Sequence, residues 1–281
     1  MQIIDAHQHF WRLADRAGQW PPASLVEIHR DFGPADLQPF LERCHVSGTV
    51  LVQSLPSVAD TEYLLQLAER HAFVRGVVGW VDLKAADAAA QIDRLAQHRQ
   101  LKGLRPMLQD LDDERWIDDP ALEPAVAAMR GHRLSFDALV LPRHLGALLA
   151  FARRNPALPI VIDHAAKPAI PRGQLQPWLG DLAALAALPQ VHCKLSGLLT
   201  EAGPFPHAQR LQPWMEAVYQ LFGPRRLIWG SDWPVLNLAG HYEGWLAMAL
   251  RFCELQPGAS DETLAAIFGG NARRFYRLDG G

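Results

Sequence analysis

The sequence has few cysteines, no strongly basic segment and no long apolar run. Its three cysteines, Cys44, Cys193 and Cys253, are odd in number and widely spaced, which is typical of reduced, buried thiols rather than of a disulfide framework. The apolar runs are shorter than the roughly 20 residues of a membrane-spanning helix. The first residues also lack the basic segment and apolar stretch of a secretory signal. We therefore expect a cytoplasmic protein without a membrane partner.

Acidic and basic residues are nearly balanced. The chain has 27 Lys and Arg against 30 Asp and Glu, a formal net charge of −3, and its isoelectric point is near 6.4. Because no cluster of Lys and Arg stands out, the sequence lacks the electrostatic footprint of a nucleic-acid-binding protein. The expected partners are a small-molecule substrate and, in a homo-oligomer, another copy of the chain.

Short apolar runs alternate with segments of helical periodicity along the whole chain. Eight runs are expected to be strands: Ile3 to His9, Thr49 to Ser54, Val74 to Val81, Leu101 to Met107, Leu134 to Val140, Ile160 to His164, Val191 to Ser196 and Leu227 to Asp232. Six segments between them are expected to be helices: Thr61 to His71, Ala86 to His98, Leu122 to Arg130, Leu145 to Arg153, Leu175 to Leu188 and Ala208 to Phe222. Because parallel strands need long crossovers, this order predicts one (β/α)8 barrel (TIM barrel) domain over residues 1–281, with a doubly wound open sheet as the alternative.

Two further segments stand out. The long insertion from Phe10 to Pro34 follows the first strand, and a loop of this length is typical of a lid or substrate wall. The segment from Ser260 to Tyr276 is expected to be a closing helix, with Ser260 as its N-cap.

Polar side chains occupy the ends of strands that ought to be apolar. His7 and His9 are two residues apart, so on a strand both point to the same face. The sixth run ends at His164, the seventh at Ser196 and the eighth at Asp232. In a barrel these carboxyl ends form the rim that carries the active site. Convergence of four such strands favours a functional site, because an unpaired buried polar group costs about 1 to 3 kcal/mol.

These residues resemble the pattern of the amidohydrolase superfamily. The motifs Asp5-Ala-His-Gln-His-Phe-Trp11, Arg30-Asp-Phe32 with Asp36-Leu37, Asp163-His-Ala-Ala-Lys-Pro168, Lys194-Leu-Ser-Gly197 and Gly230-Ser-Asp-Trp-Pro234 are similar to its branch of sugar-lactone and pyrone-lactone hydrolases. The resemblance runs from the first strand to the last, and it implies a barrel hydrolase. It implies catalytic roles for His7, His9, His164 and Asp232 and does not specify the substrate.

Two departures from that pattern bear on the metal. Lys102 lies near the start of the fourth run, away from the rim where a binuclear relative carries a carboxylated lysine, and Asp137 stands on the fifth run where mononuclear relatives usually have histidine. His7, His9 and Asp232 remain a possible set of metal ligands. Because related lactonases work without metal, the resemblance favours an enzyme that needs no cofactor but can bind one divalent ion, zinc, at the barrel mouth.

A mechanism of lactone hydrolysis fits these residues. The resemblance makes Asp232 the base that takes a proton from water, while His7, His9 and His164 hold the oxyanion. Arg105 and Lys167 can orient the substrate or polarise its carbonyl. Further candidates for substrate binding are aromatic residues near strand ends and a histidine of the long insertion: Trp11, Trp80, Trp233 and His29.

The resemblance implies a fucono-, galactono- or rhamnono-lactone as substrate. The alternatives are a 2-pyrone-4,6-dicarboxylate lactonase, a metal-dependent decarboxylase of the same superfamily, and a non-catalytic sugar-binding barrel. A dianionic pyrone calls for a cluster of arginines, and the absent fifth-strand histidine counts against the decarboxylase.

Overall fold

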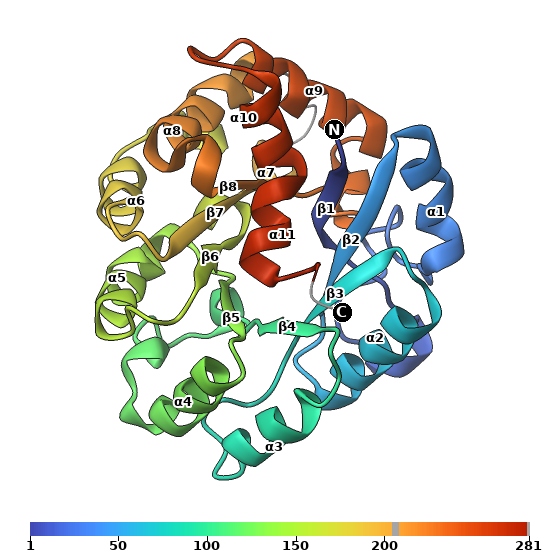
Figure 1. Cartoon of the computed structure of the whole chain (residues 1–281), viewed down its shortest axis with the longest axis vertical. Coiled ribbons are helices and arrows are strands. Elements are labelled where there is room, and N and C mark those ends of the chain that lie inside the picture. The colour runs from blue at the N-terminus through green and yellow to red at the C-terminus, as the bar shows by residue number, and fades with distance from the viewer. Residues whose placement is uncertain (204–207, 280–281) are drawn as a thin grey trace.

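A sheet of eight parallel strands forms the centre of the computed structural model, which describes residues 1–203 and 208–279 (Figure 1). The strands are β1 (Ile3–Gln8), β2 (Val46–Val52), β3 (Val74–Gly79), β4 (Leu101–Leu104), β5 (Ser135–Ala138), β6 (Ile160–Ile162), β7 (Val191–Leu195) and β8 (Leu227–Trp229). They are hydrogen-bonded in sequence order. Beyond the end of β8, the Asp232 amide donates to the His7 carbonyl at 2.7 Å and the His9 amide to the Trp233 carbonyl at 2.8 Å, which brings the last strand back to the first. The predicted TIM barrel is confirmed.

Helices surround the strands. They are α1 (Pro34–Arg43), α2 (Val58–Arg70), α3 (Ala88–Leu95), α4 (Glu123–Gly131), α5 (Leu145–Arg154), α6 (Trp178–Ala186), α7 (Leu198–Glu201), α8 (Ala208–Arg226), α9 (Tyr242–Glu254), α10 (Asp261–Ala265) and α11 (Asn271–Tyr276). Their apolar sides and the outer faces of the strands share one large buried cluster. None of the helices in the described ranges is both long and apolar enough to cross a membrane.

The last helix closes one end of the barrel. In Figure 1, α11 crosses the middle of the ring of strands. Its Phe275 and Tyr276 pack in a second buried cluster with inward-facing residues of the strands, among them Ile4, Val50 and Val161. Lys102, near the start of β4, donates to the Arg277 carbonyl at 3.3 Å at this end. The amino ends of the strands are therefore covered, and the opposite, carboxyl ends are left for a site.

Local structure departs from the sequence predictions mainly at element ends. Ser260 caps α10 as expected, accepting from the Thr263 amide at 3.3 Å, but a π-helical turn at Ala266–Gly270 separates α10 from α11. Helices α1 and α9 were not predicted. The proline at the first position of α1 and the Gly33 amide, which donates to Asp36 at 2.9 Å, mark its start.

Candidate active site

The predicted chemical residues lie at the carboxyl ends of the strands, on the floor of a cavity of about 500 Å³. His7 is on β1, His9 directly follows its last residue, and Arg105 directly follows β4. His164 lies two residues after β6, and Asp232 three residues after β8. The catalytic and polar residues that line the cavity include His9, Arg105, His164, Lys167, Glu201 and Asp232.

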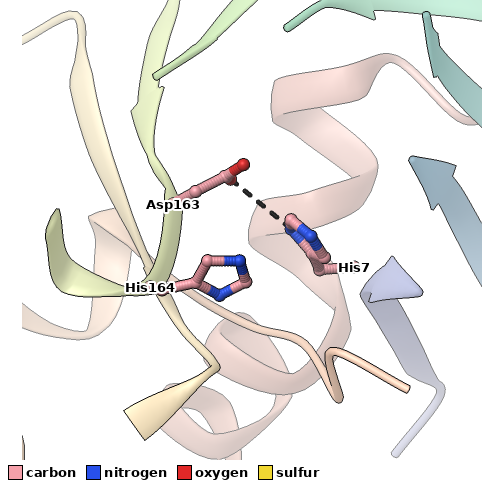
Figure 2. A group of neighbouring side chains, drawn as sticks. All are labelled: His7, Asp163 and His164. Atoms are coloured by element: carbon pink, nitrogen blue, oxygen red, sulfur yellow. Dashed lines mark ion pairs between the residues drawn. The ribbon is translucent and has the colours of Figure 1, made fainter. Parts of the chain in front are cut away.

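Three imidazoles converge on one carboxylate oxygen. Oδ1 of Asp232 lies 3.3 Å from Nε2 of His9 and 3.7 Å from Nε2 of both His7 and His164. His164 is held from behind by Ser196, whose hydroxyl lies 2.9 Å from its Nδ1. His7 is fully buried and lies behind the cavity wall, with its Nδ1 3.5 Å from Asp163 (Figure 2). The structure thus brings together the four residues that the sequence singled out.

His164 reaches the cavity through an unusual piece of backbone. His164 to Lys167 are four consecutive non-glycine residues with φ between 49° and 62°, so they form one left-handed turn. A left-handed residue costs roughly 1 to 2 kcal/mol. The turn is held by hydrogen bonds from the Lys167 amide to the His164 carbonyl and from the Trp178 indole to the Ala165 carbonyl, both 2.8 Å long. Strain of this kind is characteristic of functional sites, and here it aims His164 and Lys167 into the same cavity.

Burial and mutual proximity set the charges of the cluster. Burial lowers the pKa of His164 to about 4, and it also lowers the pKa of His9 and, strongly, that of His7. Burial by itself raises the pKa of Asp232, but the neighbouring His164, His9 and His7 outweigh it and hold that pKa well below its usual range. At neutral pH the site therefore contains an ionised carboxylate among neutral imidazoles.

The donor set of this cluster fits a divalent ion. Nδ1 of His9 lies 2.7 Å from the Val52 carbonyl, so a neutral His9 donates there and keeps its lone pair on Nε2. That lone pair faces Oδ1 of Asp232 at 3.3 Å. A neutral imidazole nitrogen and a carboxylate oxygen facing one another match the ligands that zinc prefers. Ligand atoms of His7, His9 and Asp232 all lie within 4.8 Å of one another.

A second group of charges lies directly beneath the histidines, and sequence reasoning assigned it no role. Lys194 on β7 contacts Asp137 at 2.8 Å and Asp163 at 2.9 Å, and all three side chains are fully buried. Arg105 contacts the other Asp163 oxygen at 3.2 Å and donates to the Gln53 carbonyl. The signal was present in the sequence as charged residues inside apolar strands, but it does not reveal which of them meet across the barrel.

The predicted aromatic residues do not line the cavity. Trp11 and Trp233 are buried against Phe32, Trp80 is half-buried, and exposed His29 lies with its Nδ1 3.0 Å from the Pro21 carbonyl. Instead, Gln19 and Trp20 of the long insertion form part of the wall. Trp11 packs edge-on beneath Trp20, with ring centroids 5.2 Å apart. Alternation along a strand could not find Trp20, because it lies in a loop.

The cavity has a polar side and an apolar side. On the polar side, Lys167 and Glu201 form an ion pair at 3.5 Å, and both are partly exposed to the cavity. The apolar side is formed by Leu55, Pro56, Met107, Leu139, Val235 and Leu238. The arrangement suits a small ligand with hydroxyls on one side and a hydrocarbon group on the other.

Comparison with known proteins agrees with this geometry. The chain is 59% identical over 279 residues to the L-fucono-1,5-lactonase of Burkholderia ambifaria, covering 98% of this chain and 96% of that protein. It is 36% identical to the L-fucono-1,5-lactonase of Burkholderia multivorans, with the same coverage of 98% and 96%. A crystal structure of an amidohydrolase from Burkholderia multivorans with bound zinc superimposes with a TM-score of 0.91 at 36% identity, covering 99% of this chain and 100% of that one. The family described as Amidohydrolase matches residues 4–278, and the chain belongs to it.

Proposed function

We propose that this protein hydrolyses the ring ester of a sugar-acid lactone, with L-fucono-1,5-lactone as the first substrate to test. One observation carries the chemical part of the proposal. A buried, ionised Asp232 lies among three neutral imidazoles on the floor of a cavity large enough for a small ring. The relatives named as L-fucono-1,5-lactonases support the choice of substrate.

Asp232 acts as the base. A water molecule beside Oδ1 loses a proton to this carboxylate as its oxygen attacks the lactone carbonyl carbon. The tetrahedral intermediate then collapses, the bond between the carbonyl carbon and the ring oxygen breaks, and the protonated Asp232 returns the proton to the leaving oxygen. The open hydroxy acid is the product, and the carboxylate is restored.

His164, His9 and Arg105 surround the position of the lactone carbonyl. All three line the cavity beside Asp232. Arg105 is 3% exposed, fixed by Asp163 and the Gln53 carbonyl, so its guanidinium is a preorganised donor for a developing oxyanion. His7 lies behind this layer and acts on Asp232 and His9 rather than on the substrate.

The two sides of the cavity orient the sugar. Lys167 supplies donors and Glu201 supplies acceptors within one ion pair, so together they match neighbouring hydroxyls. The methyl end of a 6-deoxy sugar lactone packs against the apolar side. If zinc is bound by His9 and Asp232, it supplies a Lewis acid for the carbonyl or for water.

A dianionic pyrone dicarboxylate suits this cavity less well. Among the described residues that line it, Arg105 and Lys167 are the cationic ones, and each is already engaged by a carboxylate. Asp110, Glu201 and Asp232 add negative charge. A second carboxylate on the substrate therefore finds no free cationic partner among these side chains.

A pH-indicator assay of the purified protein tests the proposal. We expect turnover of L-fucono-1,5-lactone and of related aldonolactones, and no turnover of 2-pyrone-4,6-dicarboxylate. Turnover of the pyrone alone would replace the sugar lactone by the dianionic substrate. Silence on every lactone would remove the proposed function and favour a decarboxylase or a sugar-binding barrel.

A further inference from the structure

Lys194 is a fully buried cation directly behind the active-site histidines. An ammonium group has three N–H donors, and three partners lie within reach of this one. They are Oδ2 of Asp137 at 2.8 Å, Oδ1 of Asp163 at 2.9 Å and Nδ1 of His7 at 3.1 Å. The first two are carboxylates and can only accept, so the third N–H is directed at His7.

The contact with Lys194 decides between two forms of neutral His7. If Nδ1 accepts from Lys194, the ring proton is on Nε2, where it faces Nε2 of His9 at 3.2 Å. His9 can accept it, because its own proton is directed at the Val52 carbonyl at 2.7 Å. Donors and acceptors then alternate from Lys194 through His7 and His9 to the backbone of β2.

The opposite form of His7 fits its surroundings less well. A proton on Nδ1 meets the Lys194 ammonium at 3.1 Å, and the lone pairs of His7 and His9 then face one another at 3.2 Å. This form gains a contact with Asp163 at 3.5 Å and a hydrogen bond from Arg105, whose Nη1 lies 3.3 Å from Nε2 of His7. These gains are longer contacts than those it gives up, so the Nε2–H form is favoured.

We propose that Lys194 is a positioning residue that keeps the proton of His7 on Nε2 and thereby opposes metal binding by His7, His9 and Asp232. A nitrogen that carries a proton offers no lone pair to a metal ion. His7 can join His9 and Asp232 as a ligand only when its proton moves to Nδ1, against the neighbouring ammonium. The barrel thus holds metal-ligand residues together while biasing one of them toward hydrogen bonding.

Long-range nitrogen NMR of the metal-free protein measures this bias directly. The His7 signals are identified by their loss in His7→Gln. We expect protonated Nε2 and unprotonated Nδ1 in the wild type. In Lys194→Met the proton is expected to move to Nδ1, where Asp163 accepts it.

Zinc affinity, measured by competition with a chromogenic chelator, is the second readout. We expect Lys194→Met to bind zinc about tenfold more tightly or better, in the range by which groups behind metal ligands alter affinity. A merely structural role for Lys194 predicts the reverse, since loosening the site weakens binding.

Two further variants control for charge and folding. Lys194→Met combined with Asp137→Asn keeps the net charge of the wild type and leaves no unpaired carboxylate at Asp137, so a gain in zinc affinity there does not arise from net charge. Tyr276→Phe removes the hydroxyl that contacts Asp137 at 2.6 Å but keeps Lys194, and it should leave the His7 proton on Nε2. A proton on Nδ1 in the wild type, or zinc affinity that is unchanged or lower in both Lys194 variants, overturns the proposal.

Discussion

Gly197 lies against the ring of His164. A Cβ atom at this glycine would sit 2.5 Å from Nδ1 of His164, and its φ of +66° is itself in the left-handed region. The same ring nitrogen lies 2.9 Å from the hydroxyl of Ser196. The close approach of β7 to the turn after β6 is therefore what fixes His164 in the cavity.

Gly197→Ala should displace His164 and reduce activity. A shift of about 1 Å at a reacting group can lower turnover by about a hundredfold, and we expect a fall of this order in kcat for the lactone. Gly173→Ala is the matched control, because its φ is +67° but a Cβ there meets nothing within 4 Å. Both variants should lose stability from backbone strain in thermal unfolding, and only Gly197→Ala should lose turnover. Equal activities would show that His164 tolerates displacement.

Glu201→Gln should weaken substrate binding more than it slows the reaction. The variant keeps the shape of the side chain but removes the charge that pairs with Lys167 at 3.5 Å. We expect KM for a hydroxylated lactone to rise by about tenfold, the value of a lost hydrogen bond to a charged group of about 1.5 kcal/mol. Steady-state kinetics separate KM from kcat, and Glu243→Gln, on the exposed part of α9, is the control. An effect on kcat alone would place Glu201 in the chemical step instead.

Removing metal should leave turnover intact. The proposed base, Asp232, and the proposed oxyanion donors are side chains of the chain itself. Protein treated with a strong chelator, and checked for zinc by elemental analysis, should keep most of its kcat. Activity that returns only on addition of zinc would instead make His9 and Asp232 essential ligands.

The protein should lose stability as the pH falls from 7 to 5, in part through His192. This residue shares the inner face of β7 with Lys194 and packs 4.8 Å from the ring of Phe275 on α11. Burial lowers the pKa of His192 from 6.5 to about 4, so the unfolded chain takes up a proton at a higher pH than the folded one. The stabilisation is complete above pH 6.5 and is lost as the pH falls toward 4, at about 1.4 kcal/mol per pH unit.

Denaturant unfolding of the wild type and His192→Leu at both pH values checks this assignment. The stability difference between the two proteins should shrink by about 2 kcal/mol from pH 7 to pH 5. Parallel pH dependences would assign the acid sensitivity to other buried histidines.

Much of the fold and part of the site could be read from the sequence. The His7 and His9 pair was predictable because strand alternation puts both on one face, and the strand ends at His164 and Asp232 followed from the alternation of strands and helices. Lys194 and Asp137 also alternate correctly, but their contact depends on the register between strands that are not neighbours. That register comes from closure of the barrel, which local patterns do not encode.

The residues that shape the cavity were harder to predict. Trp20 and Glu201 lie in a loop and in a four-residue helix, where no periodicity tells which side chains face inward. The left-handed turn from His164 to Lys167 is held by Trp178, which follows it by more than ten residues. Sequence reasoning therefore identified the chemical groups but not the walls around them.

The role of Asp232 is tested most directly by the kinetics of Asp232→Asn. The amide has nearly the same shape but cannot take a proton from water, so kcat on L-fucono-1,5-lactone should fall by about a thousandfold, within the range of a lost general base. Asp181→Asn, exposed on α6, is the control for a change of charge. A wild-type rate in Asp232→Asn would contradict the account, because no base would then be required where the structure has its buried, ionised carboxylate.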